Sequence, residues 1–424
     1  MKTPWIMSSL SEGQTSMSLN DLAGMLQEKG IVWFVRRGMR MGLKLLVGYL
    51  IWFSLRIVKS FKRVRIVRVQ ADRIGHLAYN TDIFLRQFAA KKQLKKRVLL
   101  LGVAGEVANE QLLNMYRRMF PIIQNKTAHT ILGWLPIKES EVFQDLELLH
   151  DTNYPYYKWD NAKRNLYFTP GEEVKGKELL SQMGIGDNSW FACFHSRDSA
   201  YLSGAYPEGD WNYHDFRDSD IKTYMEAARH IALSGGFAVR MGYLVSEKLP
   251  ELHEPRIIDY PSQYRSDFGD IYLPAKCKFF LGDTAGIFMV ATIFGVPVAC
   301  ANFSFLTLLT AYREGDLFIP KKIWSIELKR FLTFGEILEN GIGGYLDSKD
   351  YLESGLEVVE NTPQEILELC REMNERLDGT YEQSKEDEEL QTRFHSLFKP
   401  HHHCYGTPAR IGADFLRENR QLLS

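Results

Sequence analysis

Short apolar runs alternate with amphipathic segments along most of this sequence. Residues 64–69 predict a strand, and the apolar spacing that follows a tight turn at residues 73–76 predicts a helix. Residues 97–103 predict a second strand, followed by a helix over residues 109–120. Because strands that alternate with helices usually pair in parallel, this part of the chain predicts an α/β domain.

A second alternating series begins near residue 190. Strands are predicted within residues 190–195, 236–242, 255–261, 278–283 and 297–302, and helices over residues 220–233 and 287–294. The aromatic, aperiodic residues 151–170 predict a loop near a domain boundary. At 424 residues the chain is longer than one hydrophobic core usually supports. The expected fold class is therefore α/β, with two Rossmann-like domains facing each other across a cleft.

The expected boundaries follow the same pattern. Residues 1–28 are expected to form a mobile lead-in, residues 29–63 a membrane-associating helix, residues 64–175 the first domain and residues 176–361 the second. Residues 362–424 are expected to form helices that pack back on the domains. The first of these helices is predicted to have Thr362 as its N-cap and Pro363 in its first position.

The charge distribution near the N-terminus differs from that of the whole chain. The net charge of −1 gives the whole chain no general attraction for nucleic acid. Between Lys29 and Ala71, however, basic residues are frequent and acidic residues are absent. The uncharged residues 45–55 within this region are fewer than the roughly 20 needed to cross a bilayer. An interfacial helix on an anionic membrane surface is therefore expected, and a buried helix of the soluble fold is the alternative.

The chain carries five cysteines, an odd number, and none of them forms a CxxC pair. This usage is typical of a reducing cytoplasm. A cleaved signal peptide is not expected, because the apolar run starts too late and no small-residue cleavage site follows it. The predicted location is therefore the cytoplasmic face of the inner membrane, with the protein held peripherally or monotopically.

The first candidate site follows the strand predicted at residues 190–195. His195, Arg197 and Asp198 come at or directly after its end, and ligands of open α/β sheets bind beyond the carboxyl ends of strands. The planar guanidinium of Arg197 suits a phosphate or carboxylate, and Asp198 could orient it or hold a ligand hydroxyl. A surface ion pair is the alternative.

The second candidate is the connection after the strand predicted at residues 278–283. Asp283, Thr284, Ala285 and Gly286 lead directly into a predicted helix, whose first N–H groups and the Thr284 hydroxyl would face an anion. Helix capping by Asp283 or Thr284 is the alternative. The phosphate-binding pattern GxxxxGK[ST] occurs nowhere in the chain.

Three further residues are candidates for contact with a nucleotide. Arg240 ends another predicted strand and could join Arg197, although a salt-bridged strand end is equally consistent with the pattern. Ser266 and Asp267 precede a predicted helix, where they could cap it or contact a nucleoside.

Two short motifs suggest metal binding but are better explained otherwise. Residues 218–220, Asp-Ser-Asp, resemble a DxD motif, but they precede a helix and therefore predict an N-cap. Residues 401–404, His-His-His-Cys, lack paired ligand spacing. No metal site is expected.

The sequence resembles a family of bacterial glycosyltransferases of GT-B architecture that are encoded among surface-polysaccharide genes. The resemblance runs from about residue 64 to the C-terminus and rests on the motifs RIGHLAYNTDIFLR, CFHSRDSAYL, YHDFRDSDIKTYMEAARHIALSGG, VRMG, KFFLGDTAGI and ENTPQEI. It is distantly similar to fucosyltransferase-like enzymes, in which the arginine of an HxR loop holds the nucleotide diphosphate. His195-Ser196-Arg197 matches that pattern.

The resemblance implies an acceptor site in the first domain, a nucleotide-sugar site in the second, and no cofactor or metal. His76 is then the candidate general base, with Arg73 beside it and Gly75 on the acceptor side. Arg197, Arg240 and residues 284–286 would stabilise the leaving diphosphate. The acceptor would be a glycan or a lipid-linked sugar. A non-catalytic nucleotide-sugar or glycan-binding protein, or a nucleotide-sugar epimerase, are the alternatives.

Overall fold

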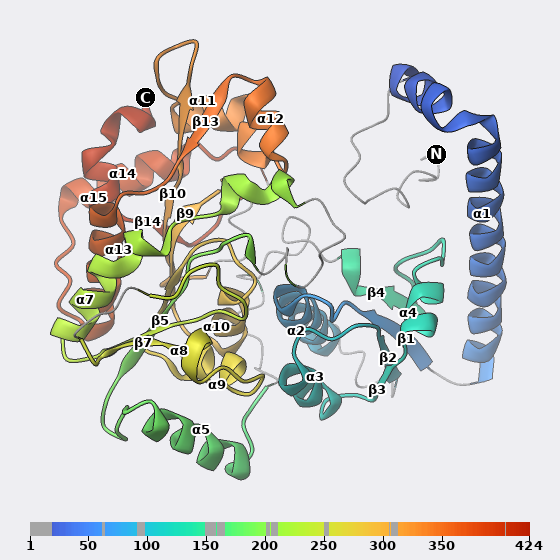
Figure 1. The fold of residues 1–424 in the computed structure, drawn as a ribbon, viewed down its shortest axis with the longest axis horizontal. Coiled ribbons are helices and arrows are strands. Elements are labelled where there is room, and N and C mark those ends of the chain that lie inside the picture. The colour runs from blue at the N-terminus through green and yellow to red at the C-terminus, as the bar shows by residue number, and fades with distance from the viewer. Residues whose placement is uncertain are drawn as a thin grey trace.

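The computed structural model describes residues 19–61, 64–90, 98–148, 158, 166–200, 204, 211–249, 254–304, 306, 313–402 and 404–424. Two α/β domains stand side by side, and a long N-terminal helix runs along the outer flank of the first (Figure 1). The expected fold class, two α/β domains built on parallel sheets and preceded by an apolar helix, is confirmed.

The first domain contains a parallel sheet in the order β3-β2-β1-β4. Strands β1 and β2 lie at its centre, where Val67 and Ala104 are fully buried, and helix α2 packs its apolar residues on them. Its elements are β1 (Val64–Val69), α2 (Ile74–Ala90), β2 (Leu99–Ala104), α3 (Glu110–Arg117), β3 (Ile122–Gln124), α4 (Lys126–Leu132) and β4 (Phe143–Asp145).

The second domain contains a seven-stranded parallel sheet in the order β14-β10-β9-β8-β5-β6-β7. Strands β5, β8 and β9 are buried along their whole length, as expected when helices cover both faces of a sheet. Its elements are α5 (Pro170–Gln182), β5 (Phe191–Phe194), α7 (Met225–Leu233), β6 (Phe237–Arg240), β7 (Ile257–Asp259), α8 (Tyr260–Gln263), α9 (Gly269–Lys276), β8 (Phe280–Gly282), α10 (Phe288–Phe294), β9 (Val298–Phe303), β10 (Leu317–Pro320) and β14 (Arg410–Ile411).

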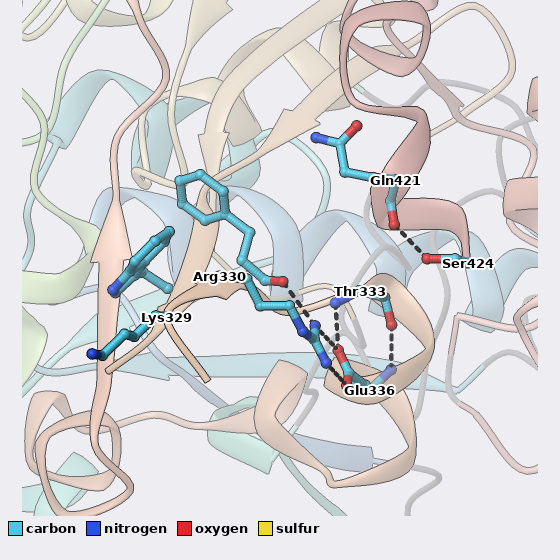
Figure 2. Close-up of a pocket in the computed structure, with 8 residues that line it drawn as sticks. Lys329, Arg330, Thr333, Glu336, Gln421 and Ser424 are labelled. Atoms are coloured by element: carbon cyan, nitrogen blue, oxygen red, sulfur yellow. Dashed lines mark hydrogen bonds and ion pairs between the residues drawn. The ribbon is translucent and has the colours of Figure 1, made fainter. Parts of the chain in front are cut away.

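A small antiparallel sheet extends the second domain. It pairs β11 (Lys322–Ser325) with β12 (Arg330–Phe331) on one side and β13 (Leu356–Val359) on the other, and α11 (Phe334–Glu339) and α12 (Ser348–Glu353) lie beside it. Arg330, Thr333 and Glu336 line a depression of about 600 Å³ that the C-terminal residues Gln421 and Ser424 close (Figure 2).

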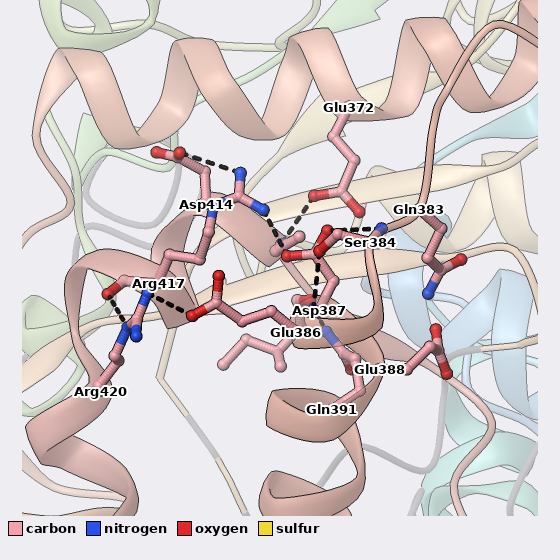
Figure 3. A network of polar contacts seen from close by, with 12 residues as sticks. Glu372, Gln383, Ser384, Glu386, Asp387, Glu388, Gln391, Asp414, Arg417 and Arg420 are labelled. Atoms are coloured by element: carbon pink, nitrogen blue, oxygen red, sulfur yellow. Dashed lines mark hydrogen bonds and ion pairs between the residues drawn. The ribbon is translucent and has the colours of Figure 1, made fainter.

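The C-terminal helices α13 (Pro363–Asp378), α14 (Lys385–Ser396) and α15 (Ala413–Glu418) pack on the second domain, α13 directly against α7. Figure 1 places them on the side away from the first domain, so they cover one domain rather than both. Arg417 ties α15 to α14 through Asp387, and Arg420 pairs with Glu386 at 2.6 Å (Figure 3). The predicted Thr362 cap is confirmed as a capping box with Glu365, and Pro363 begins α13.

The long N-terminal helix α1 (Leu19–Phe61) begins ten residues before the expected boundary at residue 29, so the end of the expected lead-in is helical. Residues 1–18 lie outside the described part of the chain. The predicted loop at residues 151–170 also lies largely outside it. The expected domain boundary at residue 175 falls within α5, which packs against α9 through Gly176 and Tyr272.

The carboxyl ends of the two sheets meet at the domain interface. Helix α2 packs against α10, and the turns at Gly75 and Gly286 touch backbone to backbone. A Cβ atom on Gly75 would lie 2.7 Å from the Gly286 Cα atom. Nearby, the Asn109 amide donates to the Asp267 carbonyl at 2.9 Å. The first-domain turn after β1 therefore faces the second-domain turn after β8.

Candidate functional site

The strand order of the second sheet changes direction at one position, between β5 and β8. From β5 the chain adds β6 and β7 in one direction, and then returns to place β8, β9 and β10 on the other side of β5. Such a switch point opens a crevice at the carboxyl ends of its two strands, where open α/β sheets bind ligands. Arg197 follows β5 and Asp283 follows β8, so two of the predicted residues flank this crevice.

The Asp283 carboxylate joins the two loops. Its Oδ2 atom accepts hydrogen bonds from the Arg197 backbone N–H at 2.6 Å and from the Ser219 hydroxyl at 2.7 Å. Asp283 is only 1% exposed, so these contacts fix the loop after β5 against the loop after β8. The structure therefore brings together Arg197 and Asp283, two of the candidate site residues.

Four cations gather around this carboxylate, and we call them the cation cluster: Arg73, Arg197, Arg217 and Lys321. The Arg197 guanidinium pairs with Asp218 and donates to the His214 carbonyl at 3.2 Å. Arg217 donates to the Thr284 carbonyl, and the Lys321 ammonium donates to the Asp218 carbonyl at 2.5 Å. The cluster therefore lies over the switch point of the sheet.

Arg73 brings the first domain into the cation cluster. It follows β1, and its guanidinium lies 5.6 Å from the centre of the Trp211 ring in the second domain. Its positive charge acts on both Arg197 and Arg217. The site is therefore built by both domains, with three cations from the second and one from the first.

Burial disfavours the charged forms of three members of the cluster, Arg197, Arg217 and Lys321. Burial lowers the pKa of Arg197 although Asp283 opposes the change. Burial and the charge of Arg197 lower the pKa of Arg217. Burial likewise lowers the pKa of Lys321, against the opposing effects of Glu360 and Asp283. Burial therefore opposes the charged forms of these three groups, and an anion bound beside them would favour the charged forms.

His214 lies in the same environment. Burial, followed by the charges of Arg217, Arg197 and Arg73, lowers the pKa of its imidazole to about 3, so the ring is neutral at physiological pH. Its Nδ1 atom is buried and has no hydrogen-bond partner within the described residues. The neutral imidazole therefore has one ring nitrogen, Nδ1, that a ligand or water could pair with.

Two buried oxygens at the crevice also lack partners within the described part of the chain: Asp283 Oδ1 and Thr284 Oγ1. Buried polar atoms are nearly always hydrogen-bonded, so unpaired ones mark a place where a ligand or water completes the site. The Thr284 hydroxyl can donate to a phosphate oxygen, whereas the carboxylate can only accept, for example from a sugar hydroxyl.

The helix after β8 begins later than the predicted anion site requires. Helix α10 begins at Phe288, so the N–H groups of residues 284–286 belong to a turn rather than to its first turn. Neither Asp283 nor Thr284 caps α10, because Asp283 is engaged by Arg197 and Ser219. Ala285 is buried, and its N–H donates to the Asp283 carbonyl at 2.8 Å. The cationic and hydroxyl groups at this site are side chains from several elements.

The first-domain candidates lie at the facing turn. His76 is on the first turn of α2, and its Nδ1 atom is 2.9 Å from Gln70 Oε1, which also accepts from Asn80 at 3.5 Å. Because an amide oxygen only accepts, Nδ1 carries the proton and Nε2 is the basic nitrogen. Gly75, the residue before it, makes the close contact with Gly286.

Other predicted residues have structural partners. Arg240 is 2% exposed, pairs with Asp259 at 3.3 Å and donates to the Glu247 carbonyl at 2.7 Å, so it is the salt-bridged strand end and does not join Arg197. Asp198 binds the Ser246 N–H at 2.9 Å and thereby ties two loops together. His195 Nδ1 lies 2.9 Å from the Met241 carbonyl.

Ser266 and Asp267 lie at the joint between the domains. The Ser266 hydroxyl accepts from the Gly269 N–H at 3.1 Å, and Phe268 is the N-cap residue of α9. Asp267 accepts from the Glu110 N–H at 3.0 Å and pairs with Arg265 at 2.7 Å. Neither residue is the N-cap of α9; Ser266 binds the first helical N–H, and Asp267 holds the start of α3 to the second domain.

Sequence reasoning missed Arg217 and Lys321. Lys321 directly follows β10, so the rule that ligands bind beyond strand ends could have indicated it. Arg217 adjoins the Asp218–Asp220 motif, where the structure confirms the predicted cap: Asp220 accepts from the Lys222 N–H at 2.9 Å. The first domain also places His129, Arg68, Asp145 and Glu147 beside the end of β1, which no motif indicated.

The depression of Figure 2 is separate from the cation cluster. Its polar groups are already paired, since Arg330 binds Glu336 at 2.6 Å and Glu336 also accepts from the Thr333 N–H at 2.8 Å. Within the described residues, no group of three or more His, Cys, Asp or Glu side chains is placed to hold a metal ion. Three of the buried polar atoms that lack a partner within the described residues, His214 Nδ1, Asp283 Oδ1 and Thr284 Oγ1, belong to the site at the switch point.

Comparisons with known proteins give only distant likenesses. No protein-family model and no curated protein matches the chain. Among solved structures, the Escherichia coli ADP-heptose LPS heptosyltransferase II matches 56% of this chain and 83% of its own at 11% identity and a TM-score of 0.38. A family 9 glycosyl transferase from Veillonella parvula matches 74% of this chain and 97% of its own, at 11% identity and a TM-score of 0.44. With TM-scores below 0.5, these likenesses carry no argument about activity.

Proposed function

We propose that the protein is a glycosyltransferase that moves a sugar from a nucleotide-sugar donor to a glycan or lipid-linked acceptor in bacterial surface-polysaccharide synthesis. The observation that carries the proposal is the cation cluster at the switch point of the second sheet, with His76 on the first-domain turn that contacts the second domain at Gly286. Clustered cations suit a diphosphate, and a histidine on the first domain suits an acceptor hydroxyl.

The chemistry follows from this placement. The donor diphosphate binds Arg197, Arg217, Lys321 and the Thr284 hydroxyl, with Arg73 reaching it from the first domain. The acceptor oxygen attacks the anomeric carbon, its proton passes to His76 Nε2, and the bond from the anomeric carbon to the diphosphate oxygen breaks. The cluster stabilises the charge that develops on the leaving diphosphate, which is the role a metal ion plays in other transferases.

The direct test is incubation of the full-length protein with UDP-, GDP-, ADP- and CMP-sugars, with and without EDTA. We expect one nucleotide sugar to raise the unfolding temperature and to release nucleotide when an acceptor is supplied. Because side-chain cations neutralise the diphosphate, we expect EDTA to leave binding and release unchanged. Absence of any binding would refute the donor site, and loss of binding with EDTA would refute metal independence.

Substitution of two arginines, one in the cation cluster and one in a structural ion pair, tests whether the cluster binds the donor. Arg217→Met is expected to weaken nucleoside-diphosphate binding about 10- to 150-fold, equivalent to about 1.5 to 3 kcal/mol for lost charged hydrogen bonds. The free energy of unfolding without ligand is expected to fall by less than about 1 kcal/mol, because the lost bond is offset by relief of repulsion from Arg197. Calorimetry and denaturant unfolding measure the two quantities.

Arg240→Met is the matched control. It leaves Asp259 buried without its partner, so we expect it to destabilise the protein by about 3 to 5 kcal/mol while the folded fraction binds nucleotide normally. The reverse pattern, with binding lost in Arg240→Met and kept in Arg217→Met, would place the donor away from the cluster.

The alternatives remain distinct in outcome. A non-catalytic nucleotide-sugar or glycan-binding protein would bind the donor without releasing nucleotide, and an epimerase would convert one nucleotide sugar into another without any acceptor. The placement of His76 opposite the cation cluster favours transfer, because it supplies a base on the side from which an acceptor would approach.

We also propose that the enzyme works at the cytoplasmic face of the inner membrane. The five cysteines are free thiols, all buried, which is compatible with a reducing compartment. The basic α1 supplies the membrane contact. Fractionation of the producing cell would test this location, and recovery in the soluble or the external fraction would contradict it.

A further inference from the structure

The outward face of α1 is a continuous apolar stripe. Eight of its large side chains recur every three or four residues, each at least half exposed, and this spacing places them on one side of a helix. We call them the outer stripe: Val32, Val35, Met39, Leu43, Leu46, Leu50, Phe53 and Ile57. An apolar surface of this length is unusual on a soluble domain and indicates an interaction site.

Between Gly48 and Leu55, the opposite face of α1 packs on the first domain. Ile51, Trp52 and Leu55 pack against the hydrophobic cluster of Leu135 and its neighbours in the first domain. At Gly48 the backbones nearly touch, since a Cβ atom there would lie 2.2 Å from the Trp134 carbonyl oxygen. The outer stripe therefore lies on the side of the helix away from this packed segment.

This packing decides how α1 can meet a bilayer. Within the described residues, Ile31–Ile57 is the one helical segment whose length and composition would allow it to cross a membrane. A crossing helix must be surrounded by lipid or by other apolar spans, whereas the segment around Gly48–Leu55 has a water-soluble α/β domain on one side. Crossing would draw that domain into the hydrocarbon.

The outer stripe could contact a membrane or a second copy of the chain. The charges on α1 favour the membrane. Arg36, Arg37, Arg40, Lys44 and Arg56 are all exposed on α1, and Lys44 lies 5.6 Å from the centre of the Trp134 ring on the packed side. No acidic residue occurs between Lys29 and Ala71. A second α1 helix would bring these cations against each other, whereas anionic head groups would neutralise them, each by about 1 kcal/mol near the surface.

We propose that α1 lies flat in the interface of an anionic bilayer, with the outer stripe in the boundary between head groups and acyl chains and the first domain on the aqueous side. The aromatic rings on this helix fit the same depth, because Tyr49 and Phe53 are more than half exposed. This inference does not depend on the donor site, and its test uses no nucleotide.

The first experiment is sedimentation of the full-length protein with vesicles of phosphatidylcholine alone or mixed with phosphatidylglycerol. We expect binding to the anionic vesicles only, weakened by high salt. Leu50→Glu combined with Phe53→Glu should lower partitioning at least tenfold. Leu233→Glu is the matched control, because Leu233 is an 85% exposed leucine on α7, far from the stripe, and its replacement should leave binding unchanged.

The second experiment measures how deeply positions along α1 lie in the bilayer. Single cysteines placed at Val32, Leu43 and Phe53 are labelled with a fluorophore, since the native thiols are buried, and quenched with lipids brominated at different depths. A flat helix gives the same shallow depth at all three positions. Graded depths would overturn the flat orientation. Equal binding to both vesicle types would overturn the anionic preference, and a soluble dimer that Leu50→Glu dissociates would assign the stripe to a second copy and overturn the proposal.

Discussion

His76→Ala is expected to lower turnover by about 10²- to 10⁴-fold, the usual contribution of a general base, while the affinity for the donor nucleotide stays close to that of the wild type. The physical reason is the position of the ring: Gln70 Oε1 lies 2.9 Å from Nδ1 and fixes the tautomer in which Nε2 accepts a proton. Nucleotide release under saturating donor and acceptor measures turnover, and calorimetry measures affinity.

A glutamine at the same position tests the chemistry itself. His76→Gln retains size and hydrogen bonding but cannot take a proton at neutral pH, so it is expected to be nearly as slow as the alanine variant. Activity in the glutamine variant alone would make His76 a positioning residue. Full activity in both variants would mean that the turn after β1 is an ordinary strand-to-helix connection.

Gly75→Ala is expected to lower turnover on the order of 10²-fold, because small displacements of reacting groups have effects of this size. The added methyl would lie 2.7 Å from the Gly286 Cα atom, a backbone atom that cannot rotate away. The two turns must therefore separate, which moves His76 relative to the cation cluster. Overpacking of this kind is also expected to destabilise the protein by about 1 to 3 kcal/mol.

Gly171→Ala is the matched control for the methyl group that Gly75→Ala adds. Gly171 lies on α5, and a Cβ atom there would meet nothing within 4 Å, so alanine should be neutral or should stabilise the helix by about 0.5 to 1 kcal/mol. Thermal unfolding and turnover of the two variants are compared side by side. If Gly75→Ala behaved like Gly171→Ala, close contact between the domains would have no part in catalysis.

Contacts in the site were predictable from sequence only in one case. Both residues of the contact had to follow a strand that an apolar run marks clearly. Arg197 and Asp283 were indicated because each follows a fully apolar run, and the structure joins them at 2.6 Å. Arg240 has the same local pattern and yet pairs with Asp259. Nothing within a few residues of Arg240 distinguishes it from Arg197, since the difference lies in which strands are neighbours.

The sequence by itself determined the elements of this protein. The strand at Val64–Val69, the capping box of α13 and the two parallel α/β domains follow from side-chain periodicity and from residues within one helical turn. Only the tertiary structure decided that Arg217 and Lys321 join Arg197, that Gly75 touches Gly286, and that the apolar residues of α1 divide into a packed face and an outer stripe. Periodicity says that a residue is buried, but its partner depends on strand order and domain docking, which bring together residues tens to hundreds of positions apart.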